Sequence, residues 1–156
     1  MVPIIAAGVA IWGVQTQRAI ARRKATLDHL AVDNVDTDMI RARTTFIKLA
    51  LGPGGLAPYA DNDKEHSKEQ QAIRLILNDF ELVSTAIQFG IMDFEFYKQQ
   101  AGGTAIRYWE CAAPFVHAIR QKAGRNTLYC EFEALAGWIS DDHKPKKRNR
   151  LWRKFF

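Results

Sequence analysis

Acidic and polar residues gather at 61–65 (DNDKE), where they look like the start of a calcium-binding loop. Such a loop turns at a glycine in its sixth position and closes with an acid in its twelfth. His66 and Ala72 occupy those two positions in this chain. We therefore predict that residues 56–66 form a solvated polar loop and that they do not bind calcium.

Other motifs for catalysis or metal binding are absent from the sequence. The two cysteines, at 111 and 130, have neither C-x-x-C nor metal-type spacing and fit a reduced compartment. The glycine pairs at 54–55 and 102–103 lack the Lys-Ser/Thr of a phosphate loop, and neither G-x-S-x-G nor H-E-x-x-H occurs. The histidines lie in four separate segments, at His29, His66, His117 and His143. We expect no enzyme, no cofactor and no metal site.

One group of polar residues interrupts a strongly apolar segment. The group consists of Asn78, Asp79, Glu81 and Gln88. Glu81 lies between two apolar residues and Asn78 follows Leu77, and a buried amide or carboxylate needs partners. Arg74 or Arg107 could supply them. Two interpretations stay open: a hydrogen-bond network that locks the helices together, which we favour, and a partner site formed by Asn78, Glu81, Arg107 and Trp109.

The chain begins with an apolar segment, residues 2–14 (VPIIAAGVAIWGV), without a charged side chain. Extended through Gln17, it would form a helix of roughly 25 Å, slightly shorter than a hydrocarbon core of about 30 Å. A basic cluster at 18–24 follows and would stay on the cytoplasmic side. We expect contact with the bacterial inner membrane, with the main domain in the cytoplasm. The expected contact residues are Ile4, Ile5, Val9, Ile11, Trp12, Arg18, Arg22 and Arg23.

This segment has three other interpretations. A cleaved signal peptide would carry its positive charge before the apolar run, whereas here the charge follows it. Apolar runs of this length also occur as core helices of soluble proteins. Small residues (Ala6, Ala7, Gly8 and Ala10) would let two copies of the helix pack closely. A core helix or a self-associating helix would belong to a cytoplasmic protein. The self-associating helix would also make the protein a homo-oligomer.

Helical periodicity and clear stop signals divide the rest of the chain, and no stretch alternates with the period of a strand. We predict an all-α fold, a single bundle of about five to six helices with a long N-terminal helix. The predicted helices are a first of about 30 residues from Pro3, then 37–51, 67–89, 94–100, 104–122 with a kink at Pro114, and 126 or 127 to 139. The predicted division is 1–17 for the apolar segment, 18–142 for the helical domain and 143–156 for a tail.

The segment Ile76–Lys98 (ILNDFELVSTAIQFGIMDFEFYK) resembles the bacterial and prophage family catalogued as domain of unknown function 4760. The similarity also touches 22–27, 107–109 and 129–138, and it does not include the basic tail. Members of that family commonly begin with a hydrophobic helix, which the resemblance therefore implies here. The resemblance implies no activity. The residues that carry the main motif are Asn78, Phe80, Glu81, Gly90, Ile91 and Asp93.

The C-terminal tail holds the excess positive charge. Residues 143–156 contain seven of the 22 basic residues and none of the 17 acids. Basic residues mixed with aromatic ones suit an anionic membrane surface or nucleic-acid phosphates, and a solubilising end is the third possibility. The residues expected to meet an anionic partner are Lys146, Lys147, Arg148, Arg150, Trp152, Arg153 and Lys154.

These features predict a non-enzymatic, membrane-associated helical interaction module from a bacterial or prophage locus, with phage defence or counter-defence as the setting. A protein partner is expected. The alternative is a soluble phage-type binding protein that engages a host protein or nucleic acid and uses its first helix for oligomerisation.

Overall fold

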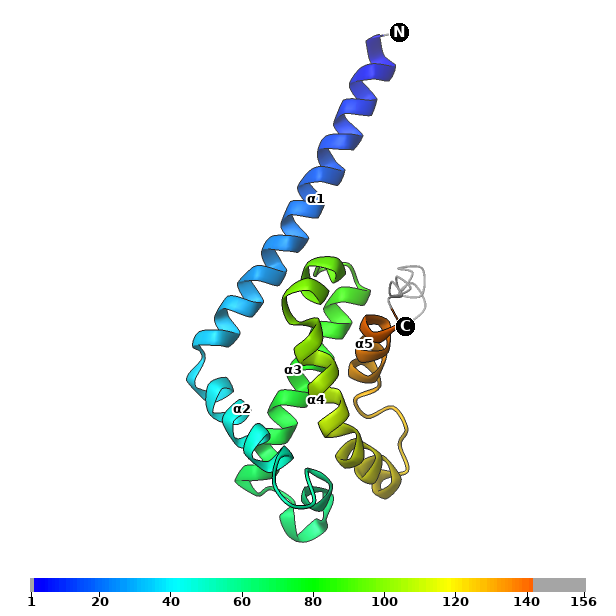
Figure 1. The fold of residues 1–156 in the computed structure, drawn as a ribbon. Coiled ribbons are helices and arrows are strands. Elements are labelled where there is room, and N and C mark those ends of the chain that lie inside the picture. Colours follow the sequence, from blue (N-terminus) through cyan, green and yellow to red (C-terminus); the bar gives the residue numbers. More distant parts are fainter. Residues whose placement is uncertain (1, 142–156) are drawn as a thin grey trace.

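The computed structural model describes residues 2–141, with side chains from residue 8 onward. This part of the chain contains five α-helices and no strand, which confirms the all-α prediction (Figure 1). The helices are α1 (Val2–Val35), α2 (Thr37–Ala50), α3 (Lys68–Gln88), α4 (Phe94–Ala123) and α5 (Cys130–Ser140), and two short 3-10 helices lie at η1 (Ala57–Ala60) and η2 (Asn62–Lys64).

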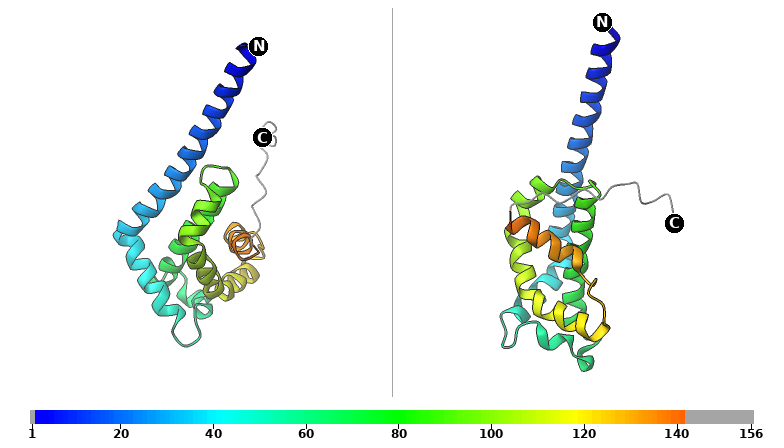
Figure 2. Two further views of the ribbon diagram at one scale, coloured as in Figure 1. Left: turned by 45° about the horizontal axis from the view of Figure 1, so that its top comes forward. Right: turned by 90° about the vertical axis from the view of Figure 1, so that its right-hand side faces the viewer.

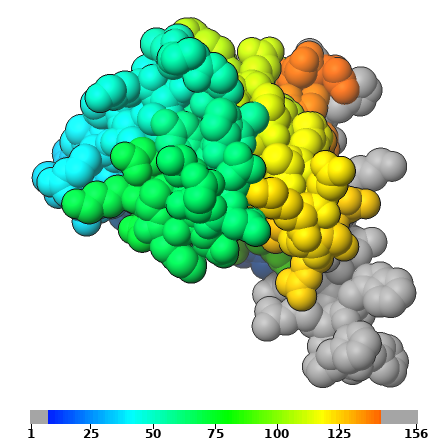
Figure 3. Space-filling model, turned by 90° about the horizontal axis from the view of Figure 1, so that it is seen from below, coloured from blue at the N-terminus to red at the C-terminus, as the bar shows by residue number. Residues whose placement is uncertain are grey.

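Helices α2 to α5 form the body of the molecule, with α3 between α2 and α5. Aromatic rings connect these helices through the core. Phe80 of α3 stacks on Phe132 of α5 with ring centroids 4.3 Å apart, and Phe46 of α2 stacks on Tyr108 of α4 at 4.8 Å. A contact between Phe80 and Tyr108 at 5.5 Å joins the two pairs. Seen from below, α2, the segment after it and α4 form one continuous surface (Figure 3).

One face of the strongly apolar helix α3 lies outside the core. Leu75, Leu82 and Phe89 are exposed, with 62% of Leu82 accessible to solvent. These three residues follow one another at intervals of seven, so they lie along one stripe of the helix. The stripe faces away from the aromatic core that buries Phe80.

Helix α1 extends away from the body as a long arm (Figures 1 and 2). Its 34 residues correspond to a rod of roughly 50 Å. Contacts with α2 and α4 involve the C-terminal part of α1, and Thr26 and Asp33 are its buried residues within the described side chains. The expected boundary after residue 17 lies inside this helix, which continues without interruption to Val35.

The predicted break at the glycine pair 102–103 is wrong, because α4 continues through both residues. The expected helices 94–100 and 104–122 are one helix that also continues through Pro114. Gly102 is buried, and a Cβ atom added there would lie 3.1 Å from Cγ2 of Ile139 in α5. The glycine therefore provides a close approach between two helices, and it does not end one.

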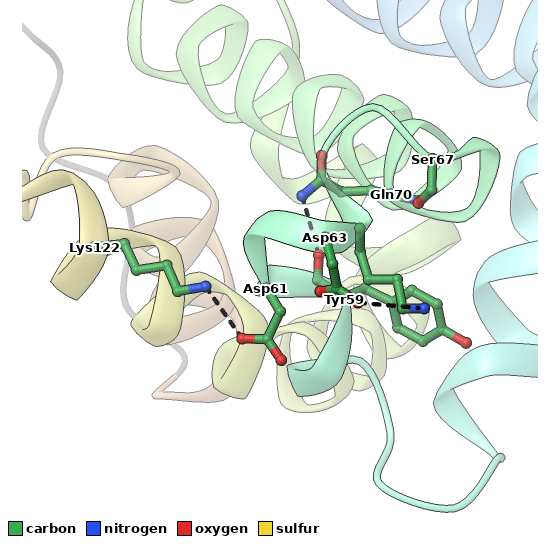
Figure 4. A network of polar contacts seen from close by, with 7 residues as sticks. Tyr59, Asp61, Asp63, Ser67, Gln70 and Lys122 are labelled. Carbon is green, nitrogen blue, oxygen red and sulfur yellow. Dashed lines mark hydrogen bonds and ion pairs between the residues drawn. The ribbon is translucent and has the colours of Figure 1, made fainter.

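The segment between α2 and α3 is also more ordered than the predicted polar loop. Leu56 and Ala60 are buried, and Lys122 of α4 donates hydrogen bonds to the Ala60 carbonyl oxygen (2.6 Å) and the Asp61 carboxylate (3.1 Å). Gln70 of α3 donates from its side chain to the Tyr59 carbonyl oxygen at 3.0 Å (Figure 4). Asp61, one of the acids considered for calcium, is thus paired with a lysine.

Candidate functional site

The first half of α1 exposes apolar side chains. Trp12 is 71% exposed, and Val9, Ile11 and Val14 are exposed as well. Successive residues of an α-helix are about 100° apart, so these four side chains surround the helix. A helix that is apolar all round is normally buried in a membrane or in a larger assembly. We call residues 8–14 the apolar arm.

A basic collar, which we define as Arg18, Arg22, Arg23 and Lys24, follows the apolar arm along the same helix. Arg22 is half-buried, whereas the other three side chains are exposed. The positive charge therefore lies between the arm and the body. The predicted contact residues Ile4 and Ile5 have side chains outside the described set.

Polar contacts attach the base of α1 to the body. The Thr26 hydroxyl accepts a hydrogen bond from the backbone N–H of Asp93, the N-cap residue of α4, at 2.9 Å. His29 Nε2 lies 3.3 Å from Oδ1 of Asp79 in α3. Positions 26, 29 and 33 share one face of the helix because they are three or four residues apart. This face therefore meets α4, α3 and α2 in turn.

Asp33 completes this face through an ion pair with Arg43 of α2, whose Nη1 also donates to the Asp33 carbonyl oxygen at 3.2 Å. The ring of Tyr97 is buried at the same junction. Burial, and then the negative charge of Asp79, raises the pKa of the Tyr97 hydroxyl, so the group stays neutral. We call His29, Asp33, Arg43 and Asp79 the arm-base cluster.

The sequence did not predict the arm-base cluster, because the four histidines lie in separate segments. The spacing of His29 and Asp33 places both on one helical face, and this was the local signal available. Asp79 comes from another helix, so its approach depends on how α1 packs against α3.

Glu81 contacts backbone groups of α5, and neither Arg74 nor Arg107 pairs with it in the described structure. Its carboxylate accepts hydrogen bonds from the N–H groups of Phe132 (2.8 Å) and Glu131 (3.3 Å). Burial raises the pKa of Glu81, although the two backbone hydrogen bonds act in the opposite direction. The carboxylate thus caps a helix that is distant in sequence.

The capping by Glu81 explains why α5 begins at Cys130 and not at the predicted 126 or 127. The N-cap residue, Tyr129, has a left-handed backbone with φ 55° and makes no side-chain capping bond. Ser84 of α3 reinforces the junction by donating a hydrogen bond to the Glu131 carbonyl oxygen at 2.6 Å. The start of α5 is therefore set by α3.

The four residues of the predicted polar site occupy different environments. Trp109 meets the same part of α5 as Glu81, with its ring 5.3 Å from that of Phe132. Asn78 and Arg107 are exposed. The arrangement of Glu81 is that of a hydrogen-bond network between helices.

The remaining predicted contacts fall outside the described residues or concern the membrane. All the expected tail residues, from Lys146 to Lys154, lie beyond residue 141, where the description ends. Among the helices that the structure describes, none is both long and apolar enough to cross a membrane.

Comparison with known proteins gives one match. A family model described as "Domain of unknown function (DUF4760)" matches residues 1–138. Neither the curated proteins nor the solved structures include a significant match to the chain. The matched range contains the apolar arm, the basic collar and all five helices up to the last turn of α5. The chain therefore belongs to the DUF4760 family.

Proposed function

We propose that this protein is a non-enzymatic helical module that attaches to an anionic membrane surface through α1 and presents its body to a protein partner. The observation that carries the proposal is the apolar arm. It is a part of α1 that lies away from the body and has exposed Val, Ile and Trp side chains on all sides. Removing one such side chain from water contributes about 1.5–3 kcal/mol. Lipid is one environment that would bury all sides of the arm.

The basic collar supports an anionic surface as the site of attachment. Each Lys or Arg near such a surface contributes about 1 kcal/mol. A helix that enters the interface with its apolar end would bring Arg18, Arg23 and Lys24 to the level of the lipid headgroups. Attachment at the interface needs no membrane-crossing helix. The proposed location is the inner leaflet of a bacterial cell, in a prophage or phage-defence setting suggested by the resemblance alone.

Vesicle flotation of the full chain tests the attachment. The wild type is expected to float with vesicles containing anionic phosphatidylglycerol and to float less with pure phosphatidylcholine. Replacing Ile11 and Trp12 by serine should reduce the bound fraction about tenfold or more, because two apolar side chains are lost from the contact. Leu82→Ser is the matched control, since Leu82 on the body is as exposed as Ile11.

The proposal fails if the wild type stays unbound with both vesicle compositions, or if the control variant loses as much binding as the arm variant. Raising the salt concentration should weaken binding, because the collar acts through charge. Unchanged binding at high salt would restrict the interaction to the apolar arm.

A second candidate function is a soluble binding protein that oligomerises through α1 and engages a host protein or nucleic acid. The same exposed arm favours it, since a second copy would also bury all sides of the helix. Sedimentation equilibrium without lipid separates the two: the wild type would form a larger species, and the Ile11→Ser/Trp12→Ser variant would be monomeric. DNA binding that is lost when residues 144–156 are deleted would support the nucleic-acid form.

A further inference from the structure

Three potential metal ligands meet at the base of α1. His29 and Asp33 are four residues apart on one face of the helix, and Asp79 approaches them from α3. One ligand atom from each side chain lies within 4.8 Å of the other two. The side chains of His29, Asp33 and Asp79 are only 21%, 8% and 14% exposed, so they form a recessed cluster between helices.

The spacing of these atoms is close to that of a zinc site. In tetrahedral coordination with bonds of about 2.0 Å, neighbouring ligand atoms are about 3.3 Å apart. His29 Nε2 and Asp79 Oδ1 already have this separation, at 3.3 Å. A shift of about 1.5 Å in a side chain would bring a carboxylate oxygen of Asp33 from the 4.8 Å limit to the same distance.

The charges in the cluster also favour a cation. Arg43 balances Asp33 through their ion pair, whereas the partner of Asp79 is an imidazole. The cluster therefore holds two recessed carboxylates but a single guanidinium, and a recessed carboxylate without a compensating charge costs free energy. A divalent ion would supply the missing charge. The contact of Arg43 with Oδ2 of Asp33 would then orient that carboxylate from outside the coordination sphere.

We propose that His29, Asp33 and Asp79 bind one divalent transition-metal ion, with zinc as the best match, and that this ion links α1 to α3. One imidazole and two carboxylates suit zinc, with manganese and ferrous iron as related candidates. The site is independent of membrane attachment. It neither uses the apolar arm nor requires lipid.

The test is an isothermal calorimetric titration. The full chain is first treated with a chelator, and zinc chloride is then added. We expect one zinc ion per chain and a rise in the melting temperature on binding, because the ion binds the folded state. His29→Gln should weaken binding about 100-fold or more while its amide can still hydrogen-bond to Asp79. His117→Gln, at an exposed histidine on α4, is the matched control and should bind as the wild type does.

Cobalt gives a second measurement, because a four-coordinate Co²⁺ ion produces intense visible absorption bands that a hydrated ion lacks. The wild type should show these bands, and His29→Gln and Asp79→Asn should not. Circular dichroism verifies that each variant is folded, and Asp33→Asn replaces Asp79→Asn if the latter does not fold. Absence of zinc binding by the wild type, or equal binding by His29→Gln and the wild type, overturns the proposal and leaves the cluster a hydrogen-bonded junction without metal.

Discussion

At the scale of single residues, Glu81 joins two helices by capping the start of α5 from α3. It lies in the interface between α3 and α5 and provides the capping oxygens that Tyr129, with its left-handed backbone, does not provide. Two N–H groups at the start of α5 have this carboxylate as their acceptor. One of these N–H groups belongs to Phe132, which is fully buried, so water cannot easily replace the carboxylate as its acceptor.

Replacing Glu81 by alanine should therefore lower the free energy of unfolding by about 1–3 kcal/mol, the usual cost of a lost cap or an unsatisfied buried donor. Chemical denaturation followed by circular dichroism measures this change. Glu110→Ala, at an exposed position on α4, is the control and should change stability by less than about 0.5 kcal/mol. Equal effects of the two substitutions would show that Glu81 does not cap α5.

Glu81 should also contribute a pH dependence of known sign. Burial raises its pKa in the folded state above the ordinary value of 4.5, so the folded chain retains a proton that the unfolded chain releases. The stability gained from this proton is fully present below pH 4.5 and is lost as the pH rises through the raised pKa. The stability of the wild type relative to Glu81→Gln should thus fall between pH 4 and pH 7. A rise over this range would contradict the assigned direction.

At the scale of helices, the close approach of α4 and α5 depends on Gly102. Its neighbour Gly103 is exposed, and an added Cβ atom there would meet nothing within 4 Å. The two glycines therefore have opposite roles within one helix. Gly102 is required by packing, whereas Gly103 only lowers the helix propensity.

Gly103→Ala should stabilise the protein by about 0.5–1 kcal/mol, because alanine is the better helix former. Gly102→Leu should destabilise it by about 1–3 kcal/mol or more, because the side chain must displace Ile139. Thermal unfolding measures both. A stabilising Gly102→Leu substitution would show that α5 can move away from α4 without cost.

This pair also shows what the sequence could predict. The predicted helix ends at 89 and 122 lie within one residue of the observed ends at Gln88 and Ala123. Gly90 and Gly124, which follow these ends, adopt positive φ, a requirement set by the local chain. Gly102 was wrongly placed at a helix end because the reason for it, Ile139, lies 37 positions away. The start of α5 and the approach of His29 to Asp79 were missed for the same reason: each is set by a contact between distant helices.

At the scale of the whole molecule, the apolar arm and the body are structurally separable. The core consists of residues from α2 to α5 and the segments between them, and α1 contributes Leu30 at its edge. The arm thus adds apolar surface without adding to the core. The arm could therefore attach the protein to a membrane without stabilising the fold.

Deleting residues 2–17 should therefore leave the melting temperature of the body within about 3 °C of the wild type, since no described core contact is removed. Differential scanning fluorimetry measures this. Deleting residues 2–33 is the comparison and should lower the melting temperature further, because Thr26 and Asp33 are then lost. A large loss of stability in the shorter deletion would show that the arm supports the fold.

The polar base of α1 also makes the helix a lever with its fulcrum near His29. About 40 Å of helix lies between that residue and the N-terminal end, so a tilt of about 15° at the base would move the tip by about 10 Å. Displacements too small to disturb the aromatic core would thus be amplified at the arm. Any event at the arm-base cluster that alters the angle between α1 and α3 would change how far the body stands from whatever holds the tip.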